Sequence, residues 1–83
     1  MKPDIALIRH TLGILRRIGD CGLEDAALKI EIEVAASRSL TNAEATDAIN
    51  FCADRGWVFR RSDTFGQDIV VITRAGVNQS FAK

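Results

Sequence analysis

Apolar residues recur at helical spacing over residues 5–18 of the chain. Ile5, Leu12 and Ile18 belong to a set that covers about half of a helical wheel, and the opposite half carries basic residues. Pro3 and Asp4 come just before this set, and proline is tolerated near a helix start. The pattern therefore predicts a first helix that ends near Ile18, before a turn with two glycines.

Residues 23–37 allow two interpretations. Strict alternation of apolar and polar residues over 28–34 indicates a strand, whereas the Ala, Leu, Glu and Lys content and the acids at 24 and 25 indicate a helix. We predict a helix, with an inward face formed by Leu23, Ala26, Ala27, Ile30 and Val34. A second apolar stripe then needs a partner surface or cover from another element, and it consists of Leu28, Ile32 and Ala35.

A capped helix and the strand after it account for residues 40–58. Thr41 is placed to cap the helix, and Glu44, three residues later, completes a capping box. Apolar residues repeat on one face as far as Gly56, which supplies a helix stop. The chain then continues directly into residues with strand character, so a helix followed at once by a strand is expected.

Two strand-like segments, 57–61 and 69–73, flank the polar loop SDTFGQD and predict a hairpin. Trp57 and Phe59 lie at its root and are expected to close the core beneath it. Phe65 lies at the tip of the loop, where an exposed aromatic side chain is expected to make a contact or to fold back onto the hairpin.

The order of these elements resembles that of the winged helix-turn-helix superfamily across nearly the whole chain. Its most specific marks are LTNAEATDAINFCADRGWV and, after the hairpin, VITRAG, in which Thr73 is placed to cap a short last helix. The chain is also similar to small winged-helix proteins of Mu-like phages and prophages. The resemblance implies one α+β domain over residues 1–83, with three core helices, a two-stranded wing and a short C-terminal helix. Winged helices serve both DNA and protein partners.

Charge is unevenly distributed along the chain. Eleven basic and eleven acidic residues cancel, so the net charge gives no overall attraction to nucleic acid. Four bases stand against two acids in residues 1–20, two bases against seven acids in 21–54, and five bases against two acids in 55–83. Both ends are therefore basic and the middle is acidic.

The helix after Thr41 is the candidate reader of the major groove in such a fold. Thr46 and Asn50 lie on its outward face and are the expected base contacts, Asn being suited to adenine. Asp47 and Asp54 share that face and oppose phosphate binding, so a merely solvated surface is the alternative. The candidate phosphate contacts are arginines around the hairpin, which alternatively keep an edge strand soluble: Arg55, Arg60, Arg61 and Arg74.

Two functions are compatible with these patterns. We favour a small DNA-binding protein that acts on double-stranded DNA as a transcriptional regulator or phage-type accessory factor. A homodimer is expected, because one small module offers limited specificity. The alternative is a protein-interaction module, in which the stripe of Leu28, Ile32 and Ala35 and the acidic middle face a protein partner.

No pattern in the chain predicts catalysis, a cofactor or a metal. His10 is the single histidine and lacks neighbours at ligand spacing, and there is no glycine-rich phosphate loop. Cys21 and Cys52 are expected to be reduced thiols in a cytoplasmic protein, although a disulfide between them is the alternative. No apolar run approaches the roughly 20 residues of a membrane helix, and a signal peptide is not expected.

Overall fold

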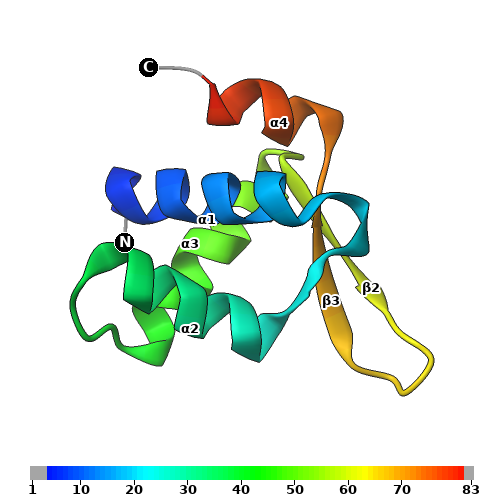
Figure 1. Cartoon of the computed structure of the whole chain (residues 1–83), viewed down its shortest axis with the longest axis horizontal. Coiled ribbons are helices and arrows are strands. Elements are labelled where there is room, and N and C mark those ends of the chain that lie inside the picture. Colours follow the sequence, from blue (N-terminus) through cyan, green and yellow to red (C-terminus); the bar gives the residue numbers. More distant parts are fainter. Residues whose placement is uncertain (1–3, 82–83) are drawn as a thin grey trace.

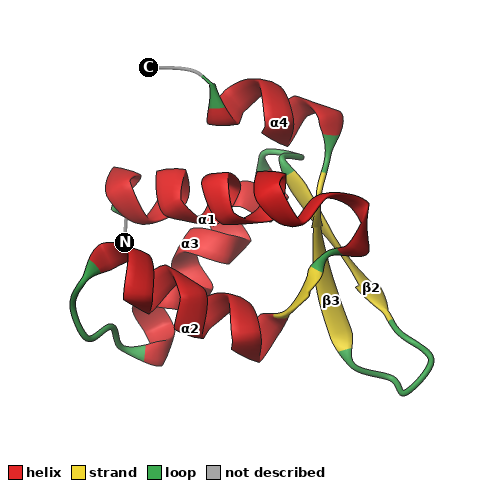
Figure 2. Cartoon of the chain, viewed as in Figure 1, coloured by secondary structure: helices red, strands yellow, loops and turns green. Residues whose placement is uncertain are grey.

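The computed structural model describes residues 4–81, which form an α+β arrangement of four helices and a small antiparallel sheet (Figures 1 and 2). The helices are α1 (Ile5–Ile18), α2 (Asp25–Ala36), α3 (Asn42–Asp54) and α4 (Arg74–Ser80), and a 3-10 turn, η1 (Gly19–Cys21), follows α1. The strands are β1 (Leu23–Glu24), β2 (Val58–Ser62) and β3 (Asp68–Ile72), in the order β1-β3-β2.

One hydrophobic core lies where α1, α2 and α3 meet the inner face of the sheet. Leu15, Leu28, Ile32, Ile49 and Val70 are fully buried there, so each of the three helices and β3 contributes to the same core. Figure 1 shows α4 on one side of α1 and α2 on the other, with the β2–β3 hairpin beyond the end of α1.

The prediction for α1 is confirmed within the described residues. The side chain of Asp4 caps the helix, since its Oδ1 accepts a hydrogen bond from the backbone N–H of Ala6 at 2.8 Å. Gly19, at φ 73°, ends the helix in a conformation that favours glycine. Pro3, which was expected near the helix start, lies outside the described residues.

The capping box of α3 is also confirmed. Thr41 Oγ1 accepts a hydrogen bond from the N–H of Glu44, and Glu44 Oε1 accepts one from the N–H of Thr41, both at 3.1 Å. Gly56, at φ 76°, follows the helix and turns the chain into β2. A second link comes from Arg38, whose guanidinium lies 3.2 Å from Glu44 and 3.6 Å from Asp4, so it joins the start of α3 to the start of α1.

This cap makes the free energy of unfolding depend on pH. The N–H of Thr41, and after it the Arg38 side chain, hold the pKa of Glu44 below its ordinary value of 4.5. Because the folded pKa is lowered, the stabilisation is complete above pH 4.5 and is lost as pH falls through the folded pKa. Urea unfolding of the protein and of Glu44→Gln is therefore expected to differ most near neutral pH, and the difference is expected to shrink below pH 4.5. A difference that stays constant with pH would contradict this role.

The helix predicted for residues 23–37 is present, but its first two residues are not part of it. Leu23 and Glu24 form β1, which pairs with Val70 and Ile69 of β3, so the sheet has a third strand beyond the two expected in the wing. Gly22 allows this approach, because a Cβ at this position would lie 2.8 Å from the carbonyl oxygen of Val70.

The predicted faces of α2 were wrong. Leu28 and Ile32, expected to face a partner, are fully buried against α1 and α3, while Ala35 is exposed. Ile30 and Val34, expected to face inward, are 64% and 69% exposed. Two apolar stripes lie on different sides of this helix, and the packing of α1 and α3 decides which one is covered.

The hairpin strands match the prediction to within one residue, and Trp57 packs against the core as expected. Phe59 does not, because it lies on the strand face opposite Val58 and is 46% exposed. Phe65 is 88% exposed at the tip of the loop. Within the loop, Asp63 Oδ1 accepts hydrogen bonds from the backbone N–H groups of Phe65 and Gln67 at 2.8 and 2.9 Å.

Candidate nucleic-acid interface

An exposed hydrogen bond joins the predicted reading helix to the hairpin. Nη2 of Arg60, on β2, donates to Oδ1 of Asn50, on α3, at 2.7 Å. Arg60 is two residues beyond the buried Val58. The side chains of Val58 and Arg60 therefore lie on the same face of β2, the one turned toward the helices. The structure thus brings together two of the predicted site residues. The sequence signal for this contact is strand alternation, which places Arg60 on the same face as the apolar Val58 two residues earlier.

The bond determines what the pair presents to a ligand. Arginine only donates hydrogen bonds, so the oxygen of the Asn50 amide must be the atom that faces Arg60. The Asn50 amide nitrogen and the remaining guanidinium N–H groups of Arg60 are then donors directed at other partners. Such a pair matches hydrogen-bond acceptors, namely phosphate oxygens or the O6 and N7 atoms of guanine. The Asn50 oxygen has a second lone pair, so the adenine contact expected for Asn50 stays a prediction beside the guanine and phosphate contacts.

Thr46 does not join this pair. Its Oγ1 is enclosed by protein and has no hydrogen-bond partner within the described residues. The outward base contact expected from Thr46 therefore does not match its position, because the polar atom that would touch a base edge is covered.

Arg61 lies on the opposite face of β2 from Arg60. Its Nη2 donates to the backbone carbonyl oxygens of Asp20 and Cys21, at 3.4 and 3.3 Å. These carbonyls belong to the 3-10 turn after α1, so Arg61 attaches that turn to the sheet. The structure separates the two adjacent arginines, which were expected to act together on phosphates.

The other two arginines lie elsewhere. The guanidinium of Arg55 is 4.8 Å from the ring centroid of Phe51, and Arg74 is exposed at the first position of α4. Of the four arginines proposed as one phosphate-binding group, the structure therefore places only Arg60 in contact with Asn50 of α3.

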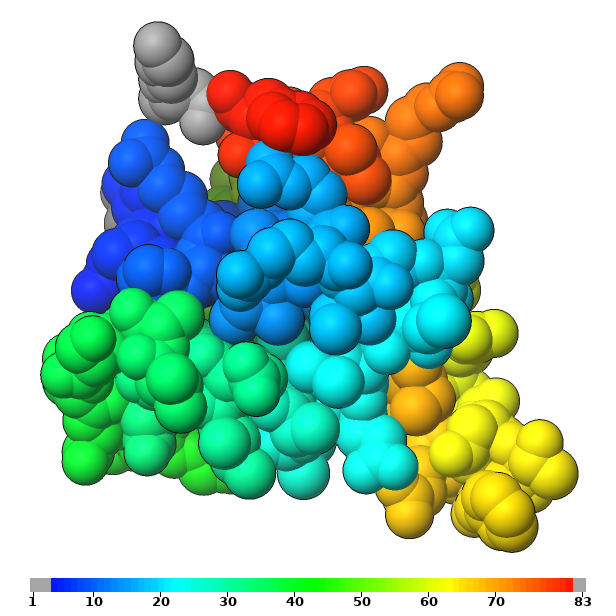
Figure 3. Space-filling view, in the orientation of Figure 1, coloured from blue at the N-terminus to red at the C-terminus, as the bar shows by residue number. Residues whose placement is uncertain are grey.

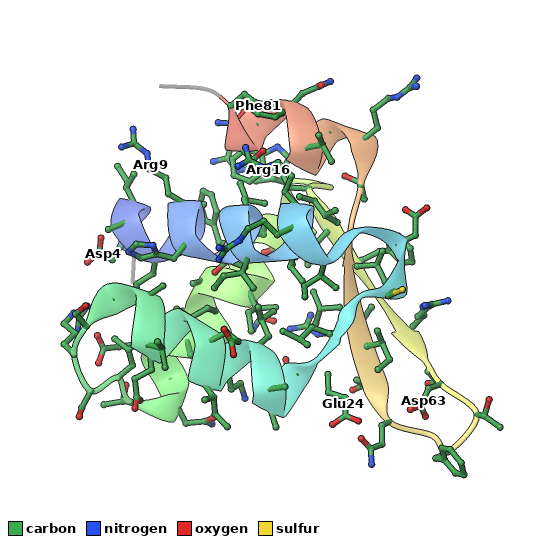
Figure 4. The ribbon with its side chains drawn as sticks, in the orientation of Figure 1. Asp4, Arg9, Arg16, Glu24, Asp63 and Phe81 are labelled. Atoms are coloured by element: carbon green, nitrogen blue, oxygen red, sulfur yellow. The ribbon has the colours of Figure 1, made fainter. Side chains whose placement is uncertain are left out.

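Acidic side chains limit the positive charge around the pair. Asp47 and Asp54 lie three positions before and four positions after Asn50, so they neighbour it along the helix surface. Figure 4 shows Glu24 and Asp63 beside the hairpin, toward its tip. These carboxylates reduce the positive potential around Arg60 and at the hairpin tip.

The described residues show no cluster of three or more His, Cys, Asp or Glu side chains that could hold a metal ion. Both described cysteines are free thiols, Cys21 exposed and Cys52 buried. Burial raises the pKa of Cys52 to about 12, so this thiol is protonated and unreactive at neutral pH.

Among the described residues no helix is both long enough and apolar enough to cross a membrane. Comparison of the chain with protein-family models, with curated proteins and with solved structures finds no match.

Proposed function

We propose that this protein is a winged helix-turn-helix module that binds double-stranded DNA through α3 and β2, as a regulator or accessory factor. The order α1-β1-α2-α3-β2-β3 with a β1-β3-β2 sheet supports this, because a winged helix needs a third helix followed directly by an antiparallel hairpin. Figure 3 shows the hairpin tip projecting past the body of the molecule, as a wing must to reach beside a duplex.

The observation that carries the proposal is the hydrogen bond between Arg60 and Asn50. It holds an arginine of the wing against the exposed face of α3, where a helix inserted in the major groove would meet base edges and phosphates. Most of the groups that the pair offers outward are donors, so acceptors on DNA suit it best. A guanine edge or a phosphate oxygen is the ligand that this arrangement suits.

The charges predict the strength of this binding. The chain has no net charge, and Asp47 and Asp54 lie on the reading face, so few counterions are released when DNA binds. About two or three phosphate contacts correspond to a log–log salt slope of roughly −2 to −3. Binding is expected to be weak for non-specific duplex and to depend mainly on Arg60.

Replacing Arg60 by alanine is expected to weaken binding to a fluorescein-labelled duplex about tenfold or more, the loss typical of one arginine contact. Arg61→Ala is the matched control, because it removes the same charge from the next residue of β2 but on the other face of the sheet. Anisotropy titrations at two salt concentrations, with circular dichroism to verify folding, measure both effects.

Equal losses in the two variants would contradict the role assigned to Arg60. If the unchanged protein shows no salt-dependent binding at low salt, DNA binding itself is wrong. The protein-interaction module would then be the better account of the exposed apolar surface of α2.

A further inference from the structure

An open apolar groove of about 250 Å³ runs along the side of α1 that faces α4. Its lining comes from α1, from the end of α3, from the residue before β2 and from α4: Ile5, Ile8, Arg9, Leu12, Phe51, Trp57, Gln79 and Ser80. Ile5 and Phe81, each 67% exposed, extend the apolar surface at its edges. The groove is too small to enclose a typical ligand, for which cavities of about 300–1,000 Å³ are usual, but it can accept apolar side chains from a protein surface.

Arginines surround this groove, and no carboxylate lines it among the described residues. Arg9 belongs to the lining, while Arg16 and Arg55 lie over the rings of Phe81 and Phe51, at 4.4 and 4.8 Å from the ring centroids. Figure 4 shows Arg9 and Arg16 on the same side of α1, with Phe81 next to Arg16. A guanidinium stacked on a ring keeps N–H groups at its edge free for a carboxylate.

The outer face of α2 is also apolar, but the charged residues beside it are acidic. Ile30 and Val34 are four residues apart and are mostly exposed, so they form one apolar ridge on this helix. Glu31 and Glu33 lie on either side of that ridge on the helical wheel, and both are exposed. The ridge is thus apolar with acidic borders, whereas the groove is apolar with basic borders.

We propose that the groove between α1 and α4 binds the outer face of α2 of a second copy of this chain. Ile30 and Val34 enter the apolar floor, and Glu31 meets Arg9 at its edge. The chain contains both surfaces, they match in apolar character, and their charges are opposite, which favours this occupant over an unrelated protein. The proposal does not depend on DNA binding.

The two surfaces lie on different sides of the molecule, since α2 and α4 flank α1 (Figure 1). The contact is therefore head-to-tail, with unlike surfaces meeting, and a pair of copies leaves one groove and one ridge free for further copies. In such an association the average molecular mass increases with protein concentration, whereas a closed dimer would reach a fixed mass. High salt weakens it, because exposed charges border the interface.

Charge reversal gives a decisive experiment. In sedimentation equilibrium at low salt, Arg9→Glu gives two acidic surfaces and Glu31→Arg gives two basic ones, so each variant alone is expected to associate at least about tenfold more weakly. An equimolar mixture of the two variants is expected to recover association, because the groove of each copy then meets an α2 of opposite charge. Arg74→Glu is the control, since Arg74 is exposed on α4 and lines neither the groove nor the surface beside Glu31.

Four results would overturn the proposal. The unchanged protein remaining a monomer at every concentration is the first. An equal loss in Arg74→Glu and Arg9→Glu is the second, since it would indicate a general charge effect. The third is a mixture of Arg9→Glu and Glu31→Arg that associates no better than either variant alone. Binding of an unrelated acidic protein to the groove, without self-association, would likewise exclude a second copy as its occupant.

Discussion

Replacing Ile32 by alanine is expected to lower the free energy of unfolding by about 2–5 kcal/mol, which is the usual range for a buried isoleucine. Ile32 is fully buried in the core between α2 and its neighbours, so the shorter side chain leaves a cavity that the surrounding helices fill only in part. A protein of 83 residues has a total stability of about 4–12 kcal/mol. The substitution therefore removes a large fraction of it, and Ile32→Glu is expected to prevent folding.

Ile30→Ala is the matched control, because it makes the same change two residues earlier in the same helix. Ile30 is 64% exposed, so its truncation is expected to change the free energy of unfolding by no more than about 0.5 kcal/mol. Urea unfolding followed by far-ultraviolet circular dichroism measures both variants. Similar losses at the two positions, or a larger loss at Ile30, would show that the orientation of α2 described above is wrong.

Gly76→Ala is expected to destabilise the protein by about 1–3 kcal/mol, the typical cost of forcing an extra methyl group into a packed interior. A Cβ at this position would meet backbone atoms of Trp57, its carbonyl carbon at 2.9 Å and its carbonyl oxygen nearer still. The same carbonyl oxygen accepts a hydrogen bond from the N–H of Thr73 at 2.9 Å, which holds the start of α4 in place. α4 must therefore move away from β2, and the groove beside it must change shape.

Gly13→Ala is expected to stabilise the protein, in contrast to Gly76→Ala. Gly13 is inside α1, and a Cβ there would have no atom within 4 Å. Alanine in a helix interior is favoured over glycine by about 0.5–1 kcal/mol, so thermal and urea unfolding are expected to show a gain in stability. If Gly76→Ala proved as stable as the unchanged protein, the close contact between α4 and Trp57 would be refuted.

Much of the fold was predictable where local chemistry and tertiary packing agree. The Thr41 and Glu44 side chains satisfy the backbone of their own helix, and Gly56 ends it, so α3 is determined by nearby residues. The hairpin is similar, because its two strands are separated only by a short polar loop. These elements were correct to within one or two residues.

The predictions from sequence were wrong where residues far apart in the sequence determine the structure. Nothing near Leu23 indicates that it will pair with Val70, and α2 has two apolar stripes that are equally suitable for burial until α1 and α3 are placed. The site shows the same limit. Asn50 was a candidate because of its position on the helical wheel, but its bond to Arg60, and the separation of Arg60 from Arg61, depend on how β2 meets α3.

The short strand β1 has a consequence for the time course of folding. α1, α3 and the hairpin consist of contacts between residues close in sequence, which form fast because little chain entropy is lost in closing them. β1 pairs with β3 across most of the middle of the chain, through Leu23 with Val70 and Glu24 with Ile69. Closing that long loop is entropically costly, and the pairing of β1 with β3 itself contributes only two residue pairs. β1 is therefore expected to join the sheet late, and the turn that leads into it from α1 is expected to be among the first parts to open.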